Sequence, residues 1–183
     1  MSNTFLILIT GPPGPGKTTL GRALSEKLKL PFMYKDGIKE TLFDTLGWKD
    51  KAWSQHLGAA SSEVLWLFAE ANLTAGHSII LESNFPPTFT VPKLMDLKSR
   101  YALEFIQIQC SARSAVLKHR VALRLASGER HPGHIDDGSE NEMRENLYAL
   151  DIDSRVIKPD TSDVESLNYK VIINEVQTLV GSR

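Results

Sequence analysis

The sequence contains a single cysteine, Cys110, among its 183 residues. A lone cysteine cannot form a disulfide within the chain, so the fold must be stabilised by packing, as is usual for proteins of a reducing compartment. We therefore expect Cys110 to be a buried structural thiol.

Long apolar stretches are also missing. No segment approaches the roughly 20 apolar residues that a transmembrane helix needs. The apolar run of residues 5–9 is short, has no basic segment before it and leads directly into glycines and prolines, unlike a signal peptide. We therefore predict a cytoplasmic protein that is neither exported nor membrane-spanning.

The chain has no excess of either charge, because 21 basic and 22 acidic residues give a formal net charge of −1. This balance disfavours general binding to nucleic acid or membrane surfaces through charge. A hydrophobic content of 42% with 23% charged residues is typical of a globular protein, not of a disordered one. The length predicts one domain, 1–183.

Apolar runs and helical periodicities alternate along the chain, which predicts an α/β fold with three layers and a five-stranded parallel sheet. The helical periodicity of residues 172, 176 and 180 favours a helix at 168–181, although residues 169–173 also fit a strand. Residues 129–138 form the expected polar loop. The other predicted elements are strands at 5–9, 31–34, 78–81, 103–108 and 155–158, and helices after Gly16 and at about 50–75, 91–100 and 111–127.

Residues 11–18 match the phosphate-loop pattern G-x-x-x-x-G-K-[ST] at every fixed position. An apolar strand precedes this loop and a helix follows it, so its backbone N–H groups and the helix N-terminus favour phosphate. We expect Lys17 to reach the β- and γ-phosphates of ATP and the Thr18 hydroxyl to ligate Mg²⁺. The predicted ATP-binding residues of this segment are Gly11, Pro12, Pro13, Gly14, Pro15, Gly16, Lys17, Thr18 and Thr19.

A P-loop by itself does not separate kinases from GTPases or motors. The chain has no guanine-reading N-K-x-D motif and little length for the additional elements of a motor. These features favour a small kinase that uses ATP and Mg²⁺. The alternative is a non-catalytic or slow ATP-dependent switch that binds a protein partner.

Two acidic residues follow predicted strands. Glu82 stands where a Walker-B acid would and is a candidate to hold Mg²⁺ through water, although polar residues are common at strand ends. Asp36 follows the second strand, where an aspartate commonly caps a turn such as residues 37–40.

The chain resembles the small kinases of the AAA-33 type, which are related to polynucleotide kinase, chloramphenicol phosphotransferase and the zeta toxins. The resemblance extends from Gly11 to about Asp160. Its marks are the P-loop, residues 34–40 (YKDGIKE), residues 81–85 (LESNF) and the segment 120–134, which ends in RHPGH. It implies that the acceptor is a hydroxyl, either of a small molecule or of a nucleic-acid 5′ end.

The resemblance also implies roles for particular residues. In such kinases an aspartate after the second strand lies near the acceptor hydroxyl, so Asp36 would orient that hydroxyl and take its proton. Relatives often carry aspartate at the position of Glu82. A lid is expected at about 112–146, with Arg120 and Arg124 as cations that close over ATP and Arg130 as a third.

At about 100° per residue, Arg113, Arg120 and Arg124 fall on one helical face with apolar residues on both sides. This arrangement predicts that the arginines point into a cleft. Surface ion pairing is the alternative, since arginines at i and i+4 often pair with nearby carboxylates. His131 and His134 lack a companion cysteine or a third histidine, which disfavours a metal site.

Overall fold

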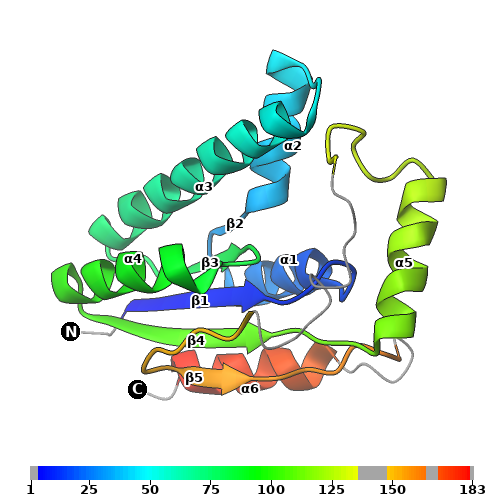
Figure 1. Cartoon of the computed structure of the whole chain (residues 1–183). Coiled ribbons are helices and arrows are strands. Elements are labelled where there is room, and N and C mark those ends of the chain that lie inside the picture. The colour runs from blue at the N-terminus through cyan, green and yellow to red at the C-terminus, as the bar shows by residue number, and fades with distance from the viewer. Residues whose placement is uncertain (1–3, 136–147, 164–168, 182–183) are drawn as a thin grey trace.

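A five-stranded parallel sheet forms the centre of the protein (Figure 1). The computed structural model describes residues 4–135, 148–163 and 169–181. The five parallel strands confirm the predicted sheet, and they lie in the order β2-β3-β1-β4-β5. Their bounds are β1 (Thr4–Thr10), β2 (Phe32–Tyr34), β3 (Ile79–Glu82), β4 (Leu103–Gln109) and β5 (Arg155–Ile157).

Helices cover both faces of the sheet, which confirms the three-layer architecture. Helices α3 and α4 pack on one face, and α1 and α6 pack on the other (Figure 1). None of the described helices has the length and apolar character to cross a membrane. The helices are α1 (Lys17–Leu28), α2 (Lys35–Leu46), α3 (Lys51–Thr74), α4 (Pro87–Arg100), α5 (Ser114–Ala126) and α6 (Tyr169–Gly181).

Strand β1 shows why the sequence there is continuously apolar. Leu6 and Leu8 belong to the core under α3 and α4, whereas Ile7 and Ile9 belong to the core under α1 and α6. Successive side chains of a strand point to opposite faces, so a strand covered on both faces needs apolar residues at every position.

Helix α2 is a correction to the sequence analysis, which expected only a short turn capped by Asp36. The helix begins directly after β2, with Tyr34 as its N-cap residue, so Asp36 lies inside the first turn. Gly37 lowers the helical propensity of the segment. Packing explains why glycine occupies position 37, because a Cβ atom there would come within 2.5 Å of the Tyr34 ring.

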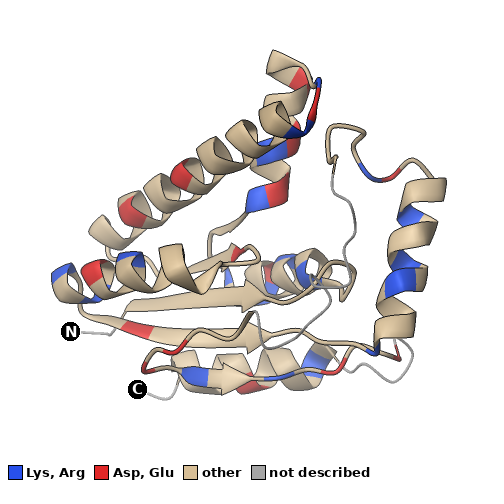
Figure 2. Cartoon of the chain, viewed as in Figure 1, with Lys and Arg blue, Asp and Glu red and all other residues tan. Residues whose placement is uncertain are grey.

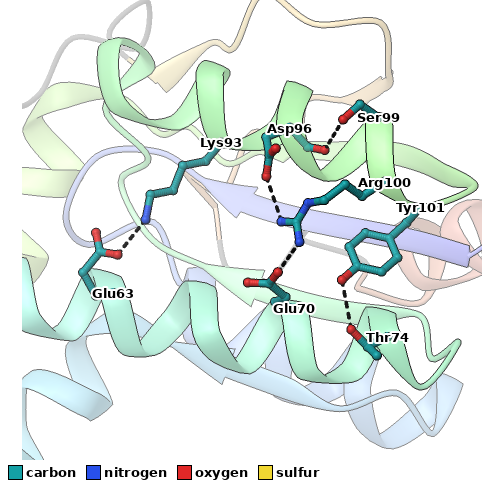
Figure 3. Close-up of polar contacts among 8 residues, drawn as sticks. All are labelled: Glu63, Glu70, Thr74, Lys93, Asp96, Ser99, Arg100 and Tyr101. Atoms are coloured by element: carbon teal, nitrogen blue, oxygen red, sulfur yellow. Dashed lines mark hydrogen bonds and ion pairs between the residues drawn. The ribbon is translucent and has the colours of Figure 1, made fainter.

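Polar contacts attach the C-terminal part of α3 to α4 (Figure 3). Lys93 Nζ lies 2.7 Å from a carboxylate oxygen of Glu63, and the Tyr101 and Thr74 hydroxyls lie 2.9 Å apart. Arg100 pairs with both Glu70 and Asp96. These contacts fix α3 to the body of the sheet, while its N-terminal part extends with α2 away from it (Figure 1).

Helix α5 stands apart from the sheet, and Leu117 is its one buried residue (Figure 1). The helix begins at Ser114, later than the expected start, because Ser111 forms a parallel bridge with Asp160 and keeps the chain extended. Arg113 therefore precedes the helix and is its N-cap residue. The predicted arginine face is reduced to Arg120 and Arg124.

Candidate active site

The carboxyl ends of three adjacent strands bring the candidate residues together. The order β2-β3-β1 places the P-loop after β1, Glu82 at the end of β3 and Asp36 after β2. Glu82 is in register with Ile9 on one side and with Tyr34 on the other. Ligands of open α/β sheets bind at this edge, so the topology groups residues that are far apart in sequence.

The P-loop has the backbone that a phosphate site needs. Gly11 has φ +137°, and a Cβ atom there would lie 2.2 Å from the carbonyl oxygen of Cys110, so no other residue fits. Cys110 is buried as predicted, and burial raises the pKa of its thiol to about 12. Gly16, with φ +85°, is the N-cap of α1, and no side chain of the described residues caps that helix end. The helix N–H groups are therefore available to an anion.

The prolines of the loop have a different role from its other residues. Pro12, Pro13 and Pro15 have no backbone N–H and fix φ, so they shape the loop without donating hydrogen bonds to phosphate. The predicted ATP-binding residues with a backbone N–H to donate are Gly11, Gly14, Gly16, Lys17, Thr18 and Thr19.

Lys17 folds back over the loop. Its Nζ donates hydrogen bonds to the carbonyl oxygens of Gly11 at 3.0 Å and Pro12 at 2.8 Å. The ammonium is thus held at the mouth of the loop by carbonyl oxygens. Phosphate oxygens of ATP are stronger, charged acceptors and would replace these carbonyls without moving the backbone.

Thr18 and Glu82, the two predicted magnesium ligands, are in direct contact. The Thr18 hydroxyl donates a hydrogen bond of 2.7 Å to Oε2 of Glu82. Mg²⁺ takes few protein oxygens and completes its shell with water and substrate phosphates. A hydroxyl and a carboxylate beside the P-loop fit such an ion.

Glu82 also shows which charges surround the site. Burial raises the pKa of Glu82, whereas Lys17, the Thr18 hydroxyl and Arg124 lower it and Asp36 raises it further. Of these groups, Thr18 is in direct hydrogen-bond contact with the Glu82 carboxylate. Asp36 is itself exposed and lies at the N-terminal end of α2, where the helix dipole favours a negative charge.

The two arginines of α5 that were predicted to belong to a lid occupy different environments. The Arg120 guanidinium donates to the Thr161 carbonyl at 2.7 Å and to the Gly14 carbonyl at 3.4 Å, so it ties α5 to the P-loop and to the segment after β5. The Arg124 side chain is exposed and has no hydrogen bond or ion pair to the described residues. Arg130 lies after α5, and its backbone N–H donates to the Arg124 carbonyl at 3.3 Å.

Charge is distributed unevenly between the helices that flank the site. Helix α5 carries Lys118, Arg120 and Arg124 and no acidic residue, whereas α2 carries acids as well as lysines (Figure 2). Of these cations, Arg120 contacts the P-loop through the Gly14 carbonyl, so α5 brings positive charge next to the predicted phosphate site.

The segment after α5, residues 130–135, reaches across to α2 and is called the lid loop below (Figure 1). The His131 ring stacks on Phe43 at 5.0 Å between centroids and the His134 ring meets it edge-on at 5.5 Å. His131 lies 3.2 Å from the Asp44 carboxylate and His134 lies 3.1 Å from that of Glu40.

Sequence analysis identified these two histidines but not their partners. The described residues contain no group of three potential metal ligands, and the histidines bind carboxylates and a ring on a helix about 90 residues earlier. No local pattern signals such a contact. The predicted lid of about 112–146 includes residues 136–146, which lie outside the described residues.

The chain is similar in sequence and structure to proteins that are already known. The family model AAA_33, described as "AAA domain", matches residues 6–150. A "putative kinase" of Chloroflexus aurantiacus j-10-fl has a solved structure that is 36% identical, covers 97% of this chain and 98% of its own, and gives a TM-score of 0.89. The family match includes the P-loop and α5 and ends before β5.

More distant proteins share the fold or a part of the sequence. The APS kinase CysC of Mycobacterium tuberculosis, solved with AMPPNP and APS, is 14% identical over 99% of both chains, with a TM-score of 0.62. A "Probable adenylyl-sulfate kinase" of Archaeoglobus fulgidus is 40% identical over 53 residues, which is 26% of this chain. The chain covers 9% and 34% of the lengths of the curated relatives that it matches.

Proposed function

The chain belongs to the AAA_33 family and is a P-loop kinase, and we propose that it transfers the γ-phosphoryl group of ATP to a hydroxyl of a small-molecule acceptor. One observation carries the proposal: the Thr18 hydroxyl of the P-loop donates a 2.7 Å hydrogen bond to Glu82 at the end of β3, and β3 lies between β1 and β2, the strand that Asp36 follows. The P-loop lysine, the candidate magnesium ligands and the carboxylate proposed for the acceptor therefore lie at the same end of the sheet.

The P-loop side of the site binds and orients ATP. Backbone N–H groups at the start of α1 and the Lys17 ammonium donate hydrogen bonds to the phosphate oxygens. Thr18 and Glu82 would hold Mg²⁺, which when bound would supply positive charge to the phosphates of ATP. Phosphoryl transfer depends mainly on positioning and charge stabilisation, so these groups leave only the acceptor hydroxyl to be prepared.

Asp36 prepares the acceptor. Its carboxylate orients the hydroxyl toward the γ-phosphorus and accepts the hydroxyl proton. The acceptor oxygen forms a bond to phosphorus while the bond from phosphorus to the bridging oxygen breaks, and ADP leaves. The products are a phosphate monoester, ADP and one proton, which passes from Asp36 to water.

Identification of the acceptor tests the proposal. The protein is incubated with Mg-ATP and a metabolite extract, and mass spectrometry records which compound gains one phosphate. We expect a small hydroxyl compound to be phosphorylated in proportion to ADP formation. A phosphorylated 5′ end in added RNA or DNA oligonucleotides would replace the small-molecule acceptor. Nucleotide-dependent binding of a protein partner without any phosphorylated product would favour a switch.

Arg124 and Arg120 should respond differently to substitution. Arg124→Ala is expected to lower kcat by about 10³-fold, the lower end for a cation that stabilises the transferring phosphoryl group, with little change in Tm because its guanidinium binds no described residue. Arg120→Ala is expected to lower Tm, since it leaves the Thr161 carbonyl without its donor.

The control for both variants is Arg155→Ala, which removes an exposed arginine on β5 at the edge of the sheet. Steady-state kinetics and thermal unfolding are measured on all three. If Arg124→Ala turns over like the wild type and unfolds at a lower temperature, Arg124 has a structural role and not a catalytic one.

A further inference from the structure

Lys39 is a buried cation with no anionic partner among the residues that the structure describes. The residue is 9% exposed, and its ammonium lies 5.3 Å from the centroid of the Phe43 ring. Among the described residues it has no hydrogen bond and no ion pair. Burial of an unpaired ammonium is costly, and a cation–π contact compensates for only part of this cost. Within the described part of the chain, no negative charge therefore compensates for the burial of the Lys39 ammonium.

The position of Lys39 relates it to the reaction. At 100° per residue along α2, Asp36, Lys39 and Phe43 lie within about 60° of one another on one face. Lys39 is about one helical turn beyond Asp36, a rise of about 5 Å. A group bound at Lys39 would thus lie on the same side of α2 as the carboxylate proposed to hold the acceptor hydroxyl, but farther from ATP.

Helix α3 leaves space beside the ammonium. Gly58 is buried in the middle of α3, and a Cβ atom there would lie 3.7 Å from both Cε and Nζ of Lys39. A Cβ atom at this separation would be in ordinary van der Waals contact with Lys39, so the glycine leaves the space of one methyl group beside the ammonium, although glycine weakens a helix interior. Every fully buried side-chain nitrogen or oxygen among the described residues has a hydrogen-bond partner. An ammonium without a hydrogen-bond partner among the described residues is therefore not fully enclosed by them.

Two of the three acidic residues of α2 are engaged elsewhere, and the third, Asp36, lies toward the P-loop. Glu40 contacts His134 at 3.1 Å and Asp44 contacts His131 at 3.2 Å, both in the lid loop. The lid loop also covers Phe43, because the Gly133 carbonyl accepts a 3.0 Å hydrogen bond from Ser54 of α3 and His131 stacks on the ring. Lys39 thus lies in a region enclosed by α2, α3 and the lid loop, with its charge left for a ligand.

We propose that Lys39 binds an anionic group of the acceptor, a carboxylate or a phosphate, while the acceptor hydroxyl lies at Asp36. This inference rests on the proposed function and adds the substrate class: a hydroxy acid or a phosphorylated alcohol. A spacing of about one helical turn between the two groups suits a compound in which a few bonds separate the anionic group from the reacting hydroxyl.

Anion binding tests the inference without the acceptor in hand. The P-loop is saturated with Mg-AMPPNP, and thermal unfolding is followed while inorganic phosphate or acetate is added at constant ionic strength. At least one of these anions is expected to raise Tm of the wild type, and Lys39→Met should abolish that shift. Phosphate alone would indicate a phosphorylated acceptor, and acetate alone would indicate a carboxylate. Equal shifts in the wild type and Lys39→Met, or no shift in either, would overturn the inference.

A second variant and a matched control separate binding from folding. Gly58→Ala adds a methyl group beside the ammonium and favours the helix, so it should weaken anion binding while Tm without anion stays the same or rises. Lys49→Met removes an exposed lysine that lies 4.8 Å from the Trp53 ring centroid, and it should leave the anion-induced shift unchanged. If Gly58→Ala shows the same anion-induced rise in Tm as the wild type, this result would also count against an anion site at Lys39.

Kinetics with the identified acceptor distinguish this inference from the proposed function. Lys39→Met is expected to raise the acceptor KM by about 10- to 100-fold, the usual scale for a lost charged hydrogen bond, with the KM for ATP unchanged. A neutral acceptor, or an unchanged KM, would refute the role of Lys39 and leave the kinase function standing. Absence of any phosphorylated product, with Lys39-dependent anion binding intact, would refute the kinase function and leave the anion site.

Discussion

Replacing Lys17 with alanine is expected to lower the rate of phosphoryl transfer by about 10³-fold or more, the scale for loss of a group that stabilises developing phosphoryl charge. The ammonium lies 3.0 Å and 2.8 Å from two carbonyl oxygens at the mouth of the P-loop, where phosphate oxygens would replace them. The glycines and prolines set the shape of the loop, so the fold should remain intact. Steady-state kinetics and thermal unfolding measure the two effects.

The control is Lys27→Ala, because Lys27 is an exposed lysine in the last turn of α1, the helix that follows the P-loop. It should turn over like the wild type. Undiminished activity of Lys17→Ala would defeat the assignment of residues 11–18 as the ATP site. A large fall in Tm would mean that Lys17 holds the loop together through its carbonyl contacts.

Asp36→Asn is expected to lower the transfer rate by about 10²-fold or more, the usual contribution of a positioned base, with little change in the affinity for Mg-ATP. Asparagine keeps the size of the side chain and its hydrogen-bonding ability but cannot accept the hydroxyl proton. The substitution is structurally mild because Tyr34, and not Asp36, is the N-cap residue of α2. Single-turnover kinetics measure the chemical step, and isothermal titration measures ATP binding.

Asp153→Asn is the control for loss of a carboxylate, since Asp153 is an exposed residue that pairs with Lys98 away from the P-loop. If Asp36→Asn transfers phosphate to the true acceptor at the wild-type rate, Asp36 has no part in the mechanism and another base must take the proton. If it loses ATP affinity as well, Asp36 acts on the nucleotide instead of the acceptor.

Most elements of the fold follow from local patterns. The apolar run at the start of the chain predicts β1, and glycine spacing before Lys17 predicts the loop and helix that follow. The choice of a helix over a strand at 168–181 is confirmed by α6, because the apolar residues at positions 172 and 176 face the sheet with a helical period. Helix α2 was missed because Gly37 lowers the helical propensity of the segment. The packing of Gly37 against the Tyr34 ring, which explains the glycine, depends on how β2 leads into the helix and leaves no local signal.

The candidate residues of the P-loop, Asp36 and Glu82 were identified from motif and position, but their mutual arrangement was not. The direct hydrogen bond between Thr18 and Glu82 joins residues 64 positions apart. Likewise, sequence spacing places Arg120 and Arg124 on one face, yet Arg120 is held by Thr161, 41 residues later, while Arg124 has no such contact. Two arginines that the helical period places on the same face therefore have different environments in the folded chain.

The sequence alone is sufficient to establish the phosphate loop, the alternation of strands and helices and the family, because each depends on residues that are neighbours along the chain. The unpaired charge of Lys39, the space at Gly58 and the contacts of the lid loop with Phe43 depend on strand order and on helices that meet across the molecule. Burial and pairing are properties of such long-range contacts. For this reason only the folded chain reveals where an acceptor's anionic group would bind.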